Sequence, residues 1–144
     1  MKTVNQLLQA KGSDVWSIAP GASVYEALAR MADKNIGALL VLDAGRLIGI
    51  FSERDYARKV VLKGKASKDT PVKEIMTSRV VYVRPEQSIE DCMALMTDKR
   101  VRHLPVLEGE RVVGVISIGD VVKSIISEQS FMIAQLENYI TGER

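Results

Sequence analysis

The chain has 144 residues, of which 47% are hydrophobic and 26% are charged, and 20 Lys and Arg against 18 Asp and Glu leave a net charge of +2. This composition excludes a disordered tail, and a chain of this length can bury about 68–70% of the surface of its unfolded form without a metal or a disulfide. The near balance of charge provides no basic field that would indicate nucleic acid as the main partner.

The single cysteine, Cys92, cannot form an internal disulfide, which favours a reducing compartment. No apolar run approaches the ~18 residues of a membrane span, and the first residues lack the apolar core of a signal peptide. One His and one Cys cannot build a structural zinc site within one chain. We therefore expect a cytoplasmic protein with no metal, no covalent cofactor and no membrane partner.

A first unit is predicted over residues 15–62, after a lead-in over residues 1–14 that holds a short helix. The unit contains three strand-like runs, of which the last two flank a turn around Gly45 and predict a hairpin: 15–18, 38–42 and 47–51. Between the first two runs, Ser23-Val-Tyr-Glu26 has the pattern of a helix capping box, followed by apolar residues at helical spacing. A second helix begins at Ser52.

A polar linker over residues 63–79 follows, in which Pro71 favours the first turn of a short helix over residues 72–76. Residues 80–122 then repeat the first unit, with a capping box at Ser88 and three strand-like runs: 80–83, 103–107 and 112–116.

The residues from 123 to 144 extend a long helix that is predicted to run from Ile118 to Ile140 and to end near Gly142. Its apolar residues outnumber what one small domain can cover: Val121, Val122, Ile125, Ile126, Phe131, Ile133, Leu136 and Ile140. We therefore expect this helix to face a second subunit.

The two units are homologous. Placing Pro20 over Pro85, a shift of 65 positions, aligns the chain with itself without a gap from Val15 over Val80 to Asp55 over Asp120. Glycines, serines and apolar positions stay in phase throughout, which indicates a tandem repeat. Because a unit of about 40–45 residues is too small to bury its sheet alone, we expect an α/β fold of two β-α-β-β-α repeats packed sheet to sheet as a pseudo-two-fold pair.

Three motifs carry a resemblance to a known family: Gly49-Ile-Phe-Ser-Glu-Arg-Asp55, Gly114-Val-Ile-Ser-Ile-Gly-Asp120 and the linker Val72-Lys-Glu-Ile-Met-Thr77. The chain resembles tandem CBS (cystathionine-β-synthase) domain pairs from residue 15 to residue 122, and the small stand-alone class in particular. This resemblance implies a non-catalytic module that binds an adenine nucleotide (AMP, ATP or NAD(H)), and a homodimer that stacks two pairs into a disc.

The repeated Ser-x-x-Asp motif has two interpretations. At a strand-to-helix junction it is also a capping box, and for an isolated match capping would be favoured. The two roles are compatible, because a helix N-terminus suits a phosphate and a carboxylate can accept hydrogen bonds from ribose hydroxyls. The resemblance assigns ribose to Asp55 and Asp120, and ribose or phosphate to Ser52 and Ser117.

The repeats differ at positions that bear on charge. Arg54 stands where the second repeat has Gly119, and Arg102-His103 stands where the first has Gly37-Ala38. Taken alone, Arg102 is a solvated charge and His103 a structural histidine, whereas the resemblance places such a basic pair beside the phosphate of a nucleotide. One cleft would then combine Ser52, Arg54, Asp55, Arg102 and His103. The other would combine Ser117, Asp120, Gly37 and Ala38.

From this difference we expect the first cleft to bind the more highly charged phosphate end of a ligand, and the second to accept a bulkier, less charged one. The resemblance places the adenine beside the backbone of Ile18–Pro20 and of Val83–Pro85. Outer contacts from Lys11, Trp16, Tyr82 and Arg84 stay open, as do core or surface roles for the same residues.

Three rival functions remain open: a nucleotide-processing enzyme, an interaction adaptor with vestigial pockets, and a redox sensor acting through NAD(H). Against an enzyme, Cys92 falls on an apolar helix face and is interpreted as a buried structural thiol. The sequence also has no nucleophile elbow, phosphate-loop lysine motif or Gly-x-Gly-x-x-Gly.

Overall fold

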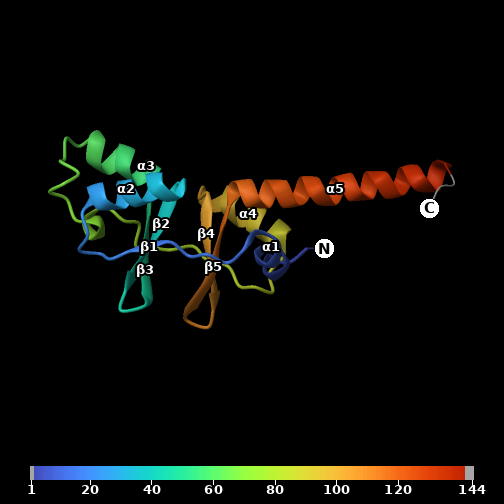
Figure 1. Cartoon of the computed structure of the whole chain (residues 1–144), viewed down its shortest axis with the longest axis horizontal. Coiled ribbons are helices and arrows are strands. Elements are labelled where there is room, and N and C mark those ends of the chain that lie inside the picture. Colours follow the sequence, from blue (N-terminus) through green and yellow to red (C-terminus); the bar gives the residue numbers. More distant parts are fainter. Residues whose placement is uncertain (1, 142–144) are drawn as a thin grey trace.

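The computed structural model describes residues 2–141 of the chain, with side chains described to residue 138. Two small sheets face each other in the middle of the molecule, and the helices cover their outer sides (Figure 1). The α-helices are α1 (Val4–Lys11), α2 (Val24–Lys34), α3 (Glu53–Tyr56), α4 (Ile89–Lys99) and α5 (Ile118–Thr141). The strands are β1 (Ser17–Ile18), β2 (Ala38–Asp43), β3 (Arg46–Ser52), β4 (His103–Glu108) and β5 (Arg111–Ser117). This arrangement confirms the expected pair of α/β repeats, with a short N-terminal and a long C-terminal helix.

Each repeat has its own core between its sheet and its helices. In repeat 1 the largest fully buried side chain is Phe51, which packs with the apolar face of α2. In repeat 2 the equivalent position is Ile116, packed with the apolar face of α4, which includes the buried Cys92. The matching hairpins even share an irregularity in strand register, after Val41 and after Val106. The internal sequence repeat therefore corresponds to a structural repeat.

The first strand of repeat 2 differs from the prediction over residues 80–83. In repeat 1, β1 pairs in parallel with β2, and the N–H of Leu40 donates to the carbonyl of Trp16 (3.2 Å). The residue equivalent to Leu40 is Pro105, which has no N–H to donate. Only an isolated bridge at Val83 remains, so repeat 2 has a two-stranded sheet.

The segment that precedes each repeat packs on the other repeat. We call these two segments, in residues 1–14 and 63–79, the lead segments. Thr3 forms a bridge with Ser88 of repeat 2, in the same way that Pro71 forms a bridge with Ser23 of repeat 1. Helix α1, capped by Thr3, therefore packs on repeat 2, although it precedes repeat 1 in the sequence. The predicted linker helix is shorter than expected, a 3-10 turn over Val72–Glu74 that packs on repeat 1.

Two glycines at the same position of the two hairpins accommodate these segments. A Cβ atom added to Gly114 would lie 2.7 Å from Cδ2 of Leu8, and one added to Gly49 would lie 2.5 Å from Sδ of Met76. The close approach of each lead segment to its hairpin explains why both repeats have glycine here. It also fixes the lead segments against the strands that end in the Ser-x-x-Asp motifs.

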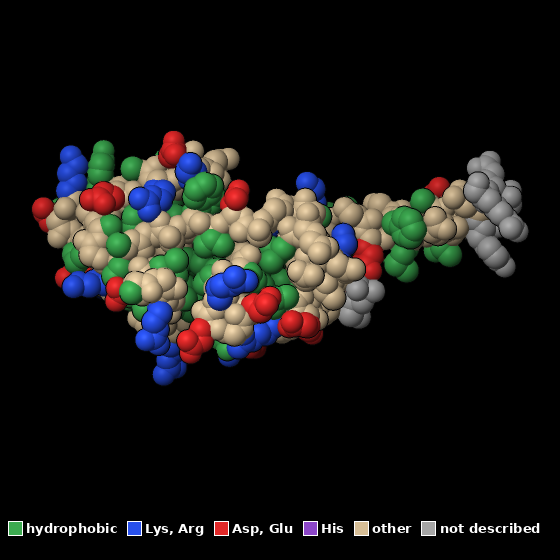
Figure 2. Space-filling model, turned by 60° about the horizontal axis from the view of Figure 1, so that its bottom comes forward, with side chains coloured by type: hydrophobic (Ala, Val, Ile, Leu, Met, Phe, Trp, Pro, Cys, Tyr) green, Lys and Arg blue, Asp and Glu red, His purple; other side chains and the backbone are tan. Residues whose placement is uncertain are grey.

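The second helix of repeat 1 is short and irregular, since α3 continues as a π-helical turn over Ala57–Val61. Its counterpart α5 projects far from the domain (Figure 1), and hydrophobic side chains are exposed along the projecting part (Figure 2). The predicted end of α5 near Gly142 and the side chain of Ile140 lie outside the described part of the chain. Within residues 2–141, no helix is both long and apolar enough to cross a membrane.

Candidate functional site: two clefts between the repeats

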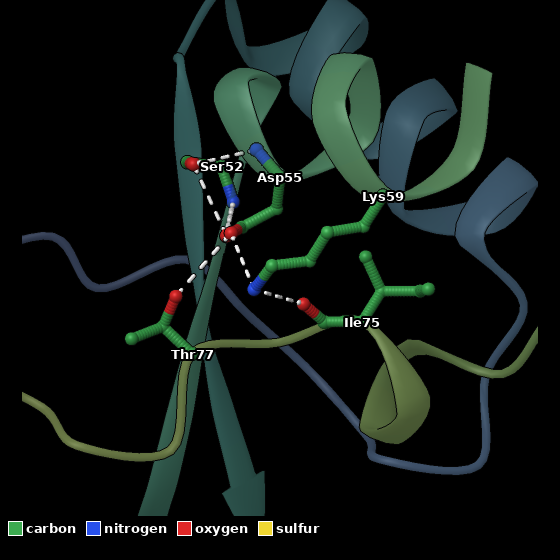
Figure 3. Close-up of polar contacts among 5 residues, drawn as sticks. All are labelled: Ser52, Asp55, Lys59, Ile75 and Thr77. Atoms are coloured by element: carbon green, nitrogen blue, oxygen red, sulfur yellow. Dashed lines mark hydrogen bonds and ion pairs between the residues drawn. The ribbon is translucent and has the colours of Figure 1, made fainter. Parts of the chain in front are cut away.

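The Ser-Asp motif of repeat 1 is a complete capping box. The Ser52 N–H donates to Oδ2 of Asp55 (3.0 Å), and the Asp55 N–H donates to Oγ of Ser52 (3.2 Å). The other carboxylate oxygen, Oδ1, accepts from Thr77 (3.3 Å) and forms an ion pair with Lys59 (3.0 Å), as Figure 3 shows. Asp55 is only 8% exposed. Any further donor to this carboxylate must therefore share Oδ1 with Thr77 and Lys59 or Oδ2 with Ser52.

The Ser117-Asp120 motif of repeat 2 has the same capping hydrogen bonds, but the lysine that pairs with its carboxylate lies in α1. The Ser117 N–H donates to Oδ2 of Asp120 (2.8 Å), and Nζ of Lys11 in α1 reaches the same oxygen (2.7 Å). Burial alone would raise the pKa of Asp120, but the hydrogen bonds from Lys11 and Ser117 outweigh it and hold the pKa below its ordinary value. Asp120 is therefore a carboxylate at neutral pH, paired with the exchanged N-terminal helix.

The Asp55 cleft is a cavity of about 750 Å³ between the repeats. It brings together all five residues predicted for it: Ser52, Arg54, Asp55, Arg102 and His103. Arg54 spans the cleft, since its Nη1 donates to the carbonyl of Arg100 in the other repeat (3.1 Å).

The Asp55 cleft is more cationic than predicted. Seven Lys and Arg side chains line it, against two carboxylates. The sequence analysis missed five of these cations: Arg58, Lys59, Arg79, Lys99 and Arg100. One of the five, Arg100, could have been found from the repeat alignment, which sets it opposite Asn35.

The Asp120 cleft is a second cavity, of about 410 Å³. All four residues predicted for it line this cavity: Gly37, Ala38, Ser117 and Asp120. One lysine, Lys11, stands against the carboxylates of Asp14 and Asp120, so the local charge is opposite to that of the Asp55 cleft. The cleft is the smaller of the two, and Trp16 and Lys11 also line it. This lining suits the less charged ligand that was expected here, and that expectation stays a prediction, whereas the volume is smaller than that of the cleft expected to be less open.

His103 lies between the two clefts and lines both, although it was predicted for one. Its ring faces Gly37, where an added Cβ would lie 3.5 Å from Cε1 of the imidazole. Burial lowers the pKa of His103 below its ordinary value of 6.5; Lys11 and Arg102 act in the same direction, and Asp120 and Glu53 oppose them. At neutral pH the imidazole is therefore mainly uncharged.

This lowered pKa predicts how stability depends on pH. When the pKa of a histidine is lower in the folded than in the unfolded protein, its contribution to stability is fully present at a pH above the pKa of the unfolded state. This contribution is lost as the pH falls through the pKa of the folded state. Between about pH 7.5 and about pH 5.5, wild type should lose more unfolding free energy in urea than His103→Gln. An identical loss in both proteins would show that His103 is not the group responsible.

The residues predicted beside adenine do not line either cavity. Ile18, Val83 and Pro85 are buried, and the carbonyl groups of Pro20 and Pro85 already accept from Lys73 and Asn5 of the lead segments. The chain lines the clefts a few residues earlier, at Asp14 and Trp16 in one and at Arg79 and Val81 in the other. Strand pairing at Ile18 and Val83, and hydrogen bonds from the lead segments at Pro20 and Pro85, occupy the backbone at the predicted positions, so the nearest free wall shifts toward the N-terminus of each repeat.

The buried cysteine does not provide a nucleophile. Cys92 is fully buried in the core of repeat 2, and burial, with Asp91 and Glu90 nearby, raises the pKa of its thiol to about 11. A thiol with so high a pKa is protonated at neutral pH and is inert. Its structural interpretation is confirmed by this placement.

Comparison with known proteins identifies the family. The CBS domain family matches the chain over residues 11–62 and 72–127. The CBS domain-containing protein CBSX3, mitochondrial, of Arabidopsis thaliana is 37% identical over 150 residues, which cover 97% of this chain and 72% of that protein. A CBS-domain protein of known structure from Burkholderia ambifaria is 54% identical, with a TM-score of 0.86, and the match covers 89% of this chain and 96% of that one.

A more distant likeness concerns the fold alone. The CBS domain pair of MJ0100, solved with 5′-methylthioadenosine and S-adenosyl-L-methionine, is 23% identical with a TM-score of 0.80, over 89% of this chain and 98% of that one.

The expected cytoplasmic location stays a prediction, since the name of CBSX3 places that relative in the mitochondrion. The match of the family over both repeats, together with the paired clefts, shows that this chain belongs to the CBS domain family as a tandem domain pair.

Proposed function

We propose that the chain is a regulatory module that binds an adenine nucleotide between its repeats and changes conformation or association when it does. The observation that carries this proposal is the composition of each cleft, where the Ser-Asp motif of repeat 1 faces the start of β4 and that of repeat 2 faces the start of β2. A ligand that contacts both repeats binds one relative arrangement of them better than others, and so shifts the population toward it.

The charges suggest which ligand suits each cleft. Seven Lys and Arg side chains in the Asp55 cleft favour a nucleotide that carries phosphate, such as AMP, ATP or NAD(H). The Asp120 cleft, with two carboxylates and one lysine, favours an adenosyl ligand of low negative charge. The adenosyl ligands in the structure of MJ0100 support the class of ligand.

Two helices meet at the Asp120 carboxylate, which provides the regulatory part of the proposal. The Asp120 motif lies at the start of α5, and Lys11 ties the same carboxylate to α1. A ligand bound to Asp120 would compete with Lys11 for one carboxylate oxygen, and would thereby act on both helices. CBS pairs are generally regulatory rather than catalytic, and we propose the same here, with a homodimer as the assembly that responds.

A thermal-shift screen of the full chain tests this proposal. AMP, ATP, NADH and S-adenosylmethionine are compared with tripolyphosphate, which carries charge but no adenine. At least one adenine ligand should raise the melting temperature more than tripolyphosphate, because a ligand at about one hundred times its Kd adds about 2.7 kcal/mol to stability. No shift with any adenine ligand would favour an adaptor with vestigial pockets.

A further inference from the structure

Both oxygens of the Asp55 carboxylate already have two partners each (Figure 3). Oδ1 accepts from Thr77 and pairs with Lys59, and Oδ2 accepts from the N–H (3.0 Å) and the hydroxyl (3.1 Å) of Ser52. Lys59 is held by a second acceptor, since its Nζ also donates to the carbonyl of Ile75 (3.0 Å). An ionised carboxylate offers about four lone-pair sites. A ribose hydroxyl can therefore bond Asp55 only after one of these contacts breaks.

The equivalent carboxylate of repeat 2 is more accessible. The N–H of Ser117 and Nζ of Lys11 both donate to one oxygen of Asp120, Oδ2. The side chain of Asp120 is 25% exposed, against 11% for that of Asp55. Of the two Ser-Asp motifs, that of repeat 2 therefore suits a ribose hydroxyl better.

The arginines of the Asp55 cleft, in contrast to its carboxylate, are mostly unpaired. Four exposed arginine side chains that line the cleft form no hydrogen bond or ion pair with any described residue: Arg58, Arg79, Arg100 and Arg102. They come from three segments, namely the π-helical turn after α3, the lead segment before repeat 2, and the connection between α4 and β4. Guanidinium groups that converge on one cavity are suited to phosphate, which they can bind with two hydrogen bonds each.

The charge of the cleft favours several phosphates over one. Its seven Lys and Arg side chains face only Glu53 and Asp55, and Asp55 is already paired with Lys59. A single phosphate monoester carries a charge of about −1.5 to −2 at pH 7 and would leave most of these cations unneutralised. A chain of phosphates can contact Arg58 of repeat 1 and Arg102 of repeat 2 at once.

We propose that the Asp55 cleft binds a linear polyphosphate through its phosphate groups alone, with no contact between Asp55 and a ribose. The ligand class comprises inorganic polyphosphate and the triphosphate of a nucleotide, whatever its base. Asp55 instead holds Lys59 and, through Thr77, joins the second lead segment to α3. The inference goes beyond the proposed function and does not rest on it, because this site requires no adenine.

Calorimetric titration of the full chain with inorganic tripolyphosphate tests the site, since this probe has no nucleoside. Tripolyphosphate should bind wild type, and Arg79→Ala should weaken the binding about tenfold, as expected when one charge-assisted hydrogen-bond donor is lost. Arg46→Ala is the matched control, because Arg46 is exposed and lines neither cleft, and this variant should keep the wild-type affinity. No binding of tripolyphosphate, or equal losses in both variants, would overturn the proposal.

Two further measurements separate a phosphate site from a ribose site. GTP should compete with tripolyphosphate as well as ATP does, because the cleft does not read the base. Asp55→Asn keeps a capping side chain and removes one negative charge, so it should bind tripolyphosphate and ATP at least as tightly as wild type. A loss of ATP affinity of about tenfold in this variant, with unchanged affinity for tripolyphosphate, would assign ribose to Asp55 and overturn the proposal.

Thr77→Val tests the same point without changing the capping box. The substitution removes the hydroxyl that donates to Oδ1 of Asp55 and keeps the shape of the side chain. Affinity for ATP should then stay as in wild type, because no ribose competes for this oxygen. Tighter binding of ATP, with no change for tripolyphosphate, would show that a ribose takes the place of Thr77 and would contradict the proposal.

Discussion

Leu8→Ala is expected to lower the free energy of unfolding by about 2–5 kcal/mol, although Leu8 precedes both repeats in the sequence. The side chain is only 6% exposed and belongs to the core of repeat 2, where its methyl groups fill the space beside Gly114. Its removal leaves a cavity that the surrounding strands cannot close, because they are held in a sheet. Urea unfolding followed by circular dichroism measures the change.

The matched control is Leu62→Ala, which removes the same atoms from a side chain that is 76% exposed. This substitution should change the unfolding free energy by no more than about 0.5 kcal/mol. If both variants lost the same small amount, α1 would not be part of the folded core, and the exchange of lead segments between repeats would be wrong.

Arg102→Ala is expected to weaken ATP binding about ten- to a hundredfold, the loss of one charge-assisted hydrogen bond worth about 1.5–3 kcal/mol. Arg102 is exposed in the Asp55 cleft, and its side chain forms no hydrogen bond or ion pair with any described residue. The substitution should therefore leave stability unchanged. Adenosine, which has no phosphate, should bind wild type and variant equally, and isothermal titration calorimetry measures both ligands.

Arg111→Ala provides the control, because Arg111 is an exposed arginine at the turn of the same hairpin and lines neither cleft. Loss of ATP affinity in both variants would indicate a general effect of net charge. Unchanged affinity in Arg102→Ala would contradict the assignment of phosphate to the Asp55 cleft.

The sequence predicts the elements that its internal repeat presents twice. Both hairpins, both capped helices and the long final helix agree with the prediction, because a period of apolar residues and a capping serine determine local structure without reference to distant partners. The first strand of repeat 2 does not follow this rule. Its pairing depends on Pro105, which is distant in the sequence and lacks the N–H that the strand needs.

The repeat also predicts much of the composition of the clefts. Aligning Arg102 with Gly37 and Arg54 with Gly119 was enough to anticipate a cationic Asp55 cleft, whereas the Asp120 cleft, expected to be the more open one, is the smaller of the two. The contribution of Lys11 to the Asp120 cleft could not be foreseen, because it requires α1 to cross to the opposite repeat. Similarly, the residues expected beside adenine do not line the clefts, because Ile18 and Val83 pair with other strands. Residue type alone does not reveal this pairing.

The central claim, that an adenine nucleotide binds between the repeats without being consumed, is tested most directly by titrating ATP into the full wild-type chain in a calorimeter and then analysing the nucleotide by chromatography. The account predicts saturable binding and recovery of intact ATP. No detectable binding, or the appearance of ADP or AMP, would contradict it.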